Sequence, residues 1–253
     1  MKDYYQIGET FGSYDLVGSY VNNGQLNAQF NFNLYDTAVP TFIQENFSFE
    51  NLDKQMQKTF NVFGVNHLMG NVMDSHDKVR FMAYADADIN LNTPDAEEIG
   101  WNNPPKVDNP LSYEKLKLYI AYLLTIPGIP VVYYGDEFGM TGAADPDNRR
   151  MMRFDNELSE WEKKALQEVS KIIHLRNQHS ALRYGDFQTL QADENVYVYL
   201  RSDLNERILI AINKSNQSQE IKIKLPEFYN LKSENNTVLI TLPPISWKVL
   251  EVE

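Results

Sequence analysis

The sequence of 253 residues contains no cysteine, which excludes a disulfide bridge and a thiolate metal site. It also has no apolar run approaching the roughly 18 residues that a bilayer-spanning helix needs. The residues that follow Met1, from Lys2 to Gln6, are too polar for the apolar region of a signal peptide. These absences predict no membrane span, and they leave the compartment open between cytoplasm, periplasm and exterior.

Basic side chains are few, because 23 Lys and Arg stand against 35 Asp and Glu, for a formal net charge of −12. Such a surface repels a phosphate backbone and no basic stripe offsets it, so we expect no nucleic-acid partner. Hydrophobic residues make up 43% of the chain. That share is sufficient for the core of one large domain, or of a medium and a small one.

Up to about residue 180, strand-like apolar runs alternate with helical patterns. The strand candidates are 4–8, 28–35, 68–73 and 129–134. We expect helices after Ser48, Ser112 and Ser159, which are favourable N-cap residues. The last of these begins with the capping-box pattern Ser159-x-x-Glu162, and Trp161 is expected to face inward. Apolar strands separated by amphipathic helices predict a parallel sheet covered by helices, an α/β fold with a long polar loop over about 86–110.

After about residue 181 the pattern changes to short alternating strands separated by polar turns. The expected strands are 186–191, 196–201, 207–213, 220–225, 237–242 and 246–251. This pattern predicts a small antiparallel β-sandwich. We therefore divide the chain into an α/β unit over residues 1–180 and an all-β unit over residues 181–253.

Three acidic clusters follow predicted parallel strands. They are Gly8-Glu9, Asp74-Ser75-His76-Asp77 and Gly135-Asp136-Glu137. The carboxyl edge of a parallel sheet or barrel is where active sites form. Alternatively, each acid caps the following helix, where the helix dipole favours a negative charge. Three clusters on one edge favour an active site, but the spacing alone leaves its chemistry open.

Four segments resemble glycoside hydrolase family 13, the α-amylase family. Gln6-Ile7-Gly8-Glu9-Thr10 resembles the strand-five motif, and residues 71–80, which contain Asp74-Ser75-His76-Asp77, resemble the strand-seven motif. Residues 128–137 are similar to the strand-eight segment, and residues 145–150 resemble the cyclomaltodextrinase–neopullulanase branch. The resemblance implies the C-terminal half, strands five to eight, of a (β/α)8 barrel, followed by the β-sandwich.

The resemblance also implies roles in retaining cleavage of α-glucosidic bonds. That reaction needs one carboxylate as nucleophile and one carboxylic acid as proton donor. Glu9 matches the general acid/base. Asp77 matches the acid that grips sugar hydroxyls and favours the distorted, oxocarbenium-like ring. His76 matches a histidine that hydrogen-bonds the same sugar; on its own, a His-Asp pair is more often a structural contact.

Other polar and aromatic residues are weaker candidates. Asp145, Asp147 and Arg149 are expected in a loop over the active site, where they contact sugars at outer subsites or are solvated loop charges. Asp136 and Glu137 organise the floor of the site or contact substrate, with equal support for each. Asn31 and Asn33 are expected on a strand that faces the barrel mouth, and Trp101 either stacks on a glucose ring or packs within its loop.

The family's nucleophile has no counterpart in this sequence. The family carries it as an aspartate in a Gly-x-Arg-x-Asp pattern on strand four, upstream of the acid. Arg153-Phe154-Asp155 is only a partial match without a preceding strand, so Asp155 is expected to cap or salt-bridge at the next helix. Strands one to four are expected upstream. By itself, the chain is therefore expected to be inactive or nearly so.

No metal site or cofactor is expected from the residues present. The resemblance allows calcium in a full-length parent, whose ligands would lie largely upstream.

The expected partners are an α-glucan oligosaccharide and either the missing barrel half or a second copy, because open sheet edges favour pairing. The expected parent is an α-1,4-glucan hydrolase acting on starch, maltooligosaccharides or cyclodextrins. The alternatives are a non-catalytic carbohydrate-binding or scaffold protein and a transglycosylase of the same family.

Overall fold

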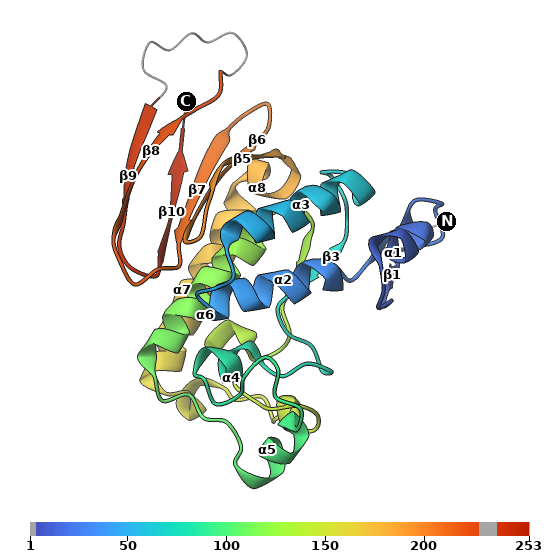
Figure 1. Cartoon of the computed structure of the whole chain (residues 1–253), viewed down its shortest axis with the longest axis vertical. Coiled ribbons are helices and arrows are strands. Elements are labelled where there is room, and N and C mark those ends of the chain that lie inside the picture. Colours follow the sequence, from blue (N-terminus) through green and yellow to red (C-terminus); the bar gives the residue numbers. More distant parts are fainter. Residues whose placement is uncertain (1–3, 228–236, 253) are drawn as a thin grey trace.

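A computed structural model describes residues 4–227 and 237–252 of the chain (Figure 1). Residues 1–3, at the start where no signal-peptide pattern was found, lie outside the described residues. An α/β unit is followed by an all-β unit, as the sequence predicted. Within the described ranges, no helix combines the length and apolar character needed to cross a membrane.

The α/β unit contains four short strands in parallel arrangement. They are β1 (Ile7–Gly8), β2 (Ala28–Gln29), β3 (Gly70–Val72) and β4 (Ile129–Val131). β1 pairs with β2 and β3 pairs with β4, while a parallel bridge between Phe30 and Gly70 joins the two pairs. The spatial order therefore follows the chain order, as it does in half of an eight-stranded barrel.

The prediction of a strand over 28–35 is wrong beyond its first residues. The strand β2 ends at Gln29, and α2 (Phe32–Ile43) begins two residues after Phe30. Asn31 caps this helix, because its Oδ1 accepts a hydrogen bond from Leu34 N at 3.3 Å. Asn31 and Asn33 therefore do not lie on a strand facing the barrel mouth: Asn31 is buried, and Asn33 is in the first turn of α2.

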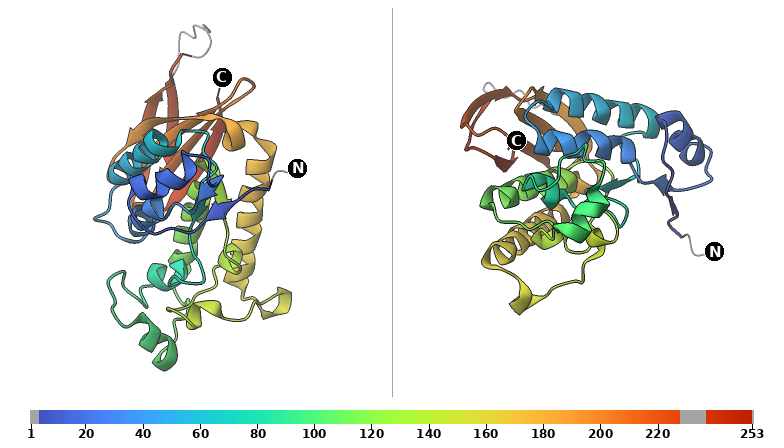
Figure 2. Two further views of the ribbon diagram at one scale, coloured as in Figure 1. Left: turned by 90° about the vertical axis from the view of Figure 1, so that its right-hand side faces the viewer. Right: turned by 60° about the horizontal axis from the view of Figure 1, so that its bottom comes forward.

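Within the described residues, the α/β unit contains eight α-helices. They are α1 (Tyr14–Val21), α2, α3 (Phe49–Phe63), α4 (Phe81–Ala85), α5 (Ala96–Asn102), α6 (Pro110–Thr125), α7 (Glu160–Gln178) and α8 (Ser180–Tyr184). Three 3-10 turns, η1 (Asp136–Phe138), η2 (Asp147–Arg149) and η3 (Asp155–Glu157), lie in the segment between β4 and α7. The loop expected over 86–110 contains one of the helices, α5. Figure 2 shows α1 and β1 at one end of the molecule, away from the C-terminal sheets.

The predicted helix starts are confirmed at two of three positions. Ser48 caps α3, and Ser159 and Glu162 form the reciprocal capping box of α7. Ser112 is instead inside α6, which is capped by Asn109 and has proline at its first position. The inward orientation expected for Trp161 is wrong, since this residue is 49% exposed.

The all-β unit is a two-layer antiparallel sandwich, as predicted. Its strands are β5 (Asp186–Ala192), β6 (Val196–Ser202), β7 (Arg207–Asn213), β8 (Gln219–Lys224), β9 (Thr237–Leu242) and β10 (Ser246–Glu251). One sheet has the order β10-β7-β6-β5, and the other consists of β8 and β9. Val196, Val198 and Leu200 face the core between these sheets.

The alternate side chains of β6 attach the sandwich to the α/β unit. Tyr197 and Tyr199 belong to the main core together with residues of α2, α3 and α6. Tyr197 stacks on Phe49 with ring centroids 5.5 Å apart, and the Tyr199 hydroxyl lies 2.6 Å from Thr125 Oγ1. Because side chains of a strand alternate between faces, β6 contributes to both cores at once.

Candidate active site

Glu9 and Asp77 both lie at the carboxyl edge of the parallel strands. Glu9 directly follows β1 and is exposed, and Asp77 lies in the turn between β3 and α4 with its side chain 47% exposed. Glu9 does not cap α1, because Ser13 accepts the hydrogen bond from Leu16 N there. Asp77 does not cap α4, because the Phe81 amide at its start donates to Asp74 instead. Both carboxylates are therefore available to a ligand at this edge.

Gly8 allows the strand that carries Glu9 to lie close against β2. A Cβ atom at this position would come within 2.5 Å of Leu26 Cδ1 and 2.7 Å of Gln29 Oε1. Only glycine fits without moving these side chains. A larger residue at position 8 would have to displace the ends of these two flexible side chains.

His76, Asp77, Asp145 and Arg149 form a surface cluster. The Arg149 guanidinium lies 3.0 Å from Asp145 Oδ2 and 3.4 Å from Asp77 Oδ1, and its Nε donates to His76 O at 3.1 Å. His76 Nε2 lies 3.4 Å from Asp77 Oδ1. The loops after β3 and β4 therefore bring together four of the residues selected from the sequence. Exposed pairs of this kind contribute little stability, so a ligand can displace them at small cost.

Asp147 has a different environment from the other selected loop residues. Its carboxylate accepts hydrogen bonds from Arg150 Nε and Nη2 at 2.8 and 2.6 Å, and from Ala143 N at 2.8 Å. Asp147 therefore stabilises the loop in which it lies, by hydrogen bonds to Arg150 and Ala143. A sugar contact for Asp147 stays a prediction, as it does for Asp145 and Arg149.

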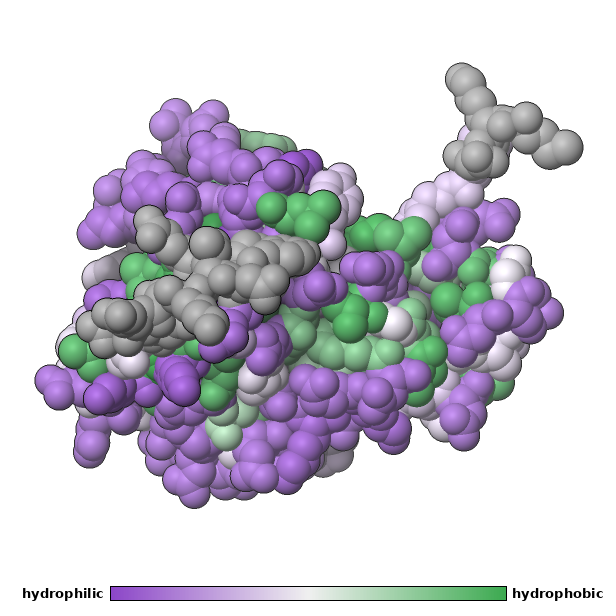
Figure 3. All heavy atoms as spheres, turned by 90° about the horizontal axis from the view of Figure 1, so that it is seen from above, coloured by the Kyte–Doolittle hydropathy of each residue, from purple (hydrophilic) through white to green (hydrophobic). Residues whose placement is uncertain are grey.

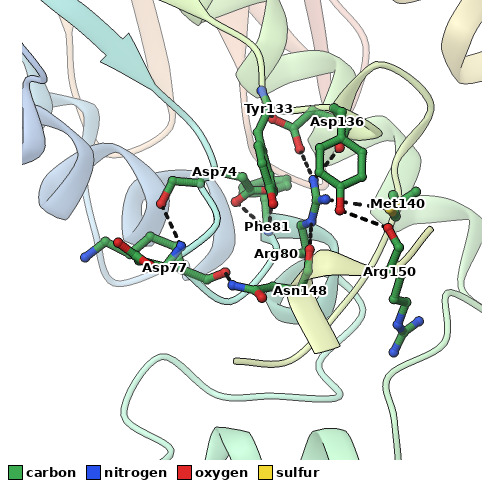
Figure 4. Close-up of polar contacts among 12 residues, drawn as sticks. Asp74, Asp77, Arg80, Phe81, Tyr133, Asp136, Met140, Asn148 and Arg150 are labelled. Carbon is green, nitrogen blue, oxygen red and sulfur yellow. Dashed lines mark hydrogen bonds and ion pairs between the residues drawn. The ribbon is translucent and has the colours of Figure 1, made fainter. Parts of the chain in front are cut away.

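Behind this cluster, a buried arginine joins the loops after β3 and β4 (Figure 4). Arg80 is fully buried, and its guanidinium donates to Asp136 Oδ1 at 2.9 Å and to Tyr134 O at 2.8 Å. Its Nε donates to Asn148 O at 2.9 Å. The ring of Tyr133 lies 4.0 Å from the guanidinium carbon. Asp136 therefore organises the floor of the site, one of the two roles considered for it.

Asp74 is buried and caps the helix that follows it. Phe81 N, at the start of α4, donates to Asp74 Oδ1 and Oδ2 at 2.8 and 3.0 Å. For this one acid, the helix-capping interpretation is confirmed. Burial raises the pKa of Asp74 to about 6, although Arg80 and the Phe81 amide oppose the increase. Burial, and then the charge of Asp74, raise the pKa of Asp136 well above its ordinary value.

The raised pKa of Asp74 predicts a pH-dependent stability difference. Because the folded chain holds this proton more tightly than the unfolded chain, the contribution is fully present below the unfolded pKa of about 4 and is lost as pH rises through about 6. The stability advantage of the unmodified chain over Asp74→Asn should therefore shrink between pH 4 and pH 7. Urea unfolding at four pH values measures this, and an advantage that stays constant or grows would contradict it.

An aromatic cluster with one lysine lies beside the two exposed acids. Phe11, two residues after Glu9, stacks on Phe32 with ring centroids 4.1 Å apart. The Lys78 ammonium lies 5.1 Å from the centroid of Phe11 and 5.2 Å from that of Tyr35. These contacts connect the segments that follow β1, β2 and β3. Arg80 and Lys78 were missed in the sequence, where the only signal was two cations within the strand-seven segment.

Asp155 has a different neighbourhood from the one expected. It begins η3, whereas the cap of α7 is Ser159. Arg153 of the same segment forms an ion pair with Glu162 in the first turn of α7. The partial match to the nucleophile motif is therefore a structural element of the connection to α7. In the part of the chain that the structure describes, no three His, Asp or Glu side chains are grouped as a metal site requires.

Comparison with known proteins agrees with this fold. The family model for the α-amylase catalytic domain matches residues 1–171, and the model for the α-amylase C-terminal domain matches residues 185–241. The chain therefore belongs to the α-amylase family, whose members similar to it include glycosidases.

Individual relatives are longer than this chain. It is 30% identical to a cyclomaltodextrinase of Geobacillus thermopakistaniensis, over 99% of this chain and 40% of that protein. It is 35% identical, over 58% of its length, to 16% of a cyclomaltodextrin glucanotransferase of Geobacillus stearothermophilus. The structure of an α-amylase of Geobacillus thermoleovorans complexed with acarbose superimposes with a TM-score of 0.80 at 26% identity, covering 99% of this chain and 54% of that one. The chain thus spans about half or less of the relatives it matches.

Proposed function

We propose that this chain supplies the acid/base half of a retaining α-1,4-glucan hydrolase site. Glu9 is the proton donor and later the general base, and Asp77 with His76 holds the sugar at the reacting position. This proposal rests on the placement of Glu9 and Asp77 at one edge of four parallel strands in an α-amylase-family fold. Both side chains are exposed, and neither caps a helix. The substrates are starch, maltooligosaccharides or cyclodextrins.

The nucleophile of this proposed site comes from a second segment that supplies strands one to four. Within the described residues, β1 and β4 each pair with only one neighbouring strand. Tyr5, just before β1, and Val132, directly after β4, are 46% and 40% exposed. Figure 3 shows apolar residues in the hollow between the body of the molecule and its N-terminal arm. A further barrel half, or a second copy of this chain, would cover such edges.

A test compares this chain alone with the completed protein, which we define as this chain joined to a segment that supplies strands one to four of an α-amylase-family barrel. The chain alone is expected to release no reducing sugar from maltoheptaose, because it lacks the nucleophile aspartate that the family carries on strand four of the complete barrel. The completed protein is expected to hydrolyse it. Hydrolysis by the chain alone that is lost in Glu9→Gln would contradict the division of the site. Glucan binding by the completed protein without turnover would instead support the scaffold alternative.

Transglycosylation is a second candidate activity, and the match to a cyclomaltodextrin glucanotransferase favours it. The same acid/base and nucleophile serve both reactions, which differ in whether water or a sugar hydroxyl attacks the glycosyl-enzyme. Product analysis with maltose added as acceptor separates the two. Elongated products would indicate transfer, and glucose and maltose alone would indicate hydrolysis. The residues present suggest no cofactor, and the ligands of any calcium in the completed protein would lie largely in its other segment.

A further inference from the structure

Asn148 faces the two peptide carbonyls that flank Asp77. It is fully buried, and its Nδ2 donates to His76 O at 2.8 Å and to Lys78 O at 2.9 Å. Since both partners are carbonyl oxygens, only the NH2 group of the amide can face them. Both of its donors are used, one on each side of Asp77 (Figure 4).

The backbone of Asn148 is itself held in place. Arg80 Nε donates to Asn148 O, and the same guanidinium is fixed by Asp136 and by Tyr134 O after β4. Asn148 also lies in the middle of η2, a turn closed by the hydrogen bond from Arg149 N to Pro146 O. A rigid series of contacts therefore runs from the end of β4 to the peptide groups around Asp77.

The side chain of Asp77 has weaker restraints of its own. Its contacts with His76 Nε2 and Arg149 Nη2 are both 3.4 Å long, and all three side chains are about half exposed. Hydrogen bonds of that length are weak. The two bonds from Asn148 are the shortest that hold the backbone around Asp77, ahead of Arg149 Nε to His76 O at 3.1 Å and Asp77 N to Ser75 Oγ at 3.2 Å.

One further atom suggests that stability alone does not explain Asn148. Its Oδ1 is buried and has no hydrogen-bond partner among the described protein atoms. A buried polar atom without a partner destabilises a fold and calls for a reason. A requirement for two donors directed at the Asp77 turn is such a reason.

We propose that Asn148 is a positioning residue, which sets the location of the Asp77 carboxylate by clamping the backbone on both sides of it. The proposal rests on the proposed function only in that Asp77 holds the sugar. Asn148 does not contact substrate. The sequence motif Asp145-Pro146-Asp147-Asn148-Arg149 thus combines exposed charges with one buried residue that orients the neighbouring loop.

The first test uses the chain alone and needs no activity. Asn148→Ala removes both donors and keeps the backbone oxygen that Arg80 binds. We expect hydrogen exchange of the segment 75–79 to increase about tenfold, as local opening becomes easier, while exchange in α6 and β6 stays unchanged. Asn216→Ala, which changes an exposed asparagine of the sandwich, is the matched control. Asn148→Asp, of equal size but with acceptors facing both carbonyls, should have the same effect.

The second test is a double-mutant cycle in the completed protein. Asn148→Ala is expected to lower kcat about 10–100-fold with a smaller change in KM, as expected for a misplaced catalytic-site group. In an Asp77→Ala background the same change should lower kcat by less than about threefold, because the group that it positions is already gone.

Three outcomes would overturn the proposal. They are exchange at 75–79 that matches the Asn216→Ala control, an equal loss of kcat in both backgrounds, and loss of folding in both Asn148 variants, which would make Asn148 part of the general framework. If the completed protein shows no α-glucan activity, the proposed function fails separately, and the exchange result alone decides the role of Asn148.

Discussion

Glu9→Gln is expected to lower kcat of the completed protein by about 10²–10⁴-fold, the usual contribution of a general acid/base. The amide keeps the size of the carboxyl group but cannot donate the proton to the leaving oxygen or later remove one from water. KM should change little, because Gln retains the shape and polarity of the side chain. Steady-state kinetics on maltoheptaose measure both constants.

The control for this prediction is Glu194→Gln, a change of an exposed acid in the turn between β5 and β6. It should leave kcat and KM unchanged. If Glu9→Gln lowers kcat less than tenfold, or alters only KM, Glu9 is not the general acid/base and at most contacts the substrate.

Arg80→Met is expected to cause the largest loss of stability, about 3–5 kcal/mol in the free energy of unfolding. Arg80 is fully buried, and its removal leaves Asp136 buried without its ion-pair partner, along with unpaired carbonyl oxygens at Tyr134 and Asn148. Urea unfolding at pH 7 measures the loss. Arg149→Met is the matched control, because that guanidinium is 43% exposed and its ion pairs should contribute at most about 1 kcal/mol.

The double variant Arg80→Met with Asp136→Asn completes this test. Removing both charges should restore part of the lost stability, since an apolar or neutral pair avoids the buried unpaired carboxylate. If Arg80→Met is no less stable than Arg149→Met, the buried ion pair does not hold the loops after β3 and β4 together. If the double variant is less stable than Arg80→Met alone, the cause of the loss is not the unpaired charge.

Local sequence patterns predicted the parts of the fold that local forces determine. The capping box at Ser159 and Glu162 depends on residues three apart, and the alternation of buried and exposed residues in β8 and β9 depends on neighbouring residues. The same reasoning failed over 28–35, where an apolar run fits a strand or a buried helix equally well. The Asn31 side chain determined the outcome there, because it accepts the Leu34 amide and starts a helix.

The site was predictable where family motifs mark residues and not where distant segments meet. Glu9, His76 and Asp77 stand in recognisable motifs after strands. Arg80 and Asn148 act through contacts with partners 56 to 72 residues away in the chain, such as those between Arg80 and Asp136 and between Asn148 and His76. Hydrophobic periodicity reflects only residues close in sequence, so it cannot predict contacts between segments this far apart. The two cations Lys78 and Arg80 in the strand-seven segment were the only sign in the sequence of these contacts.

We propose that Glu9 is the acid/base of a retaining site whose nucleophile lies on another segment. Azide rescue of Glu9→Ala in the completed protein, with an aryl α-maltoside whose leaving group needs no protonation, tests it most directly. Azide attacks the glycosyl-enzyme without a general base, so the predicted result is faster turnover and a glycosyl azide of α configuration. A β-configured azide would identify Glu9 as the nucleophile, and no rescue with undiminished hydrolysis would show that Glu9 takes no part in the reaction.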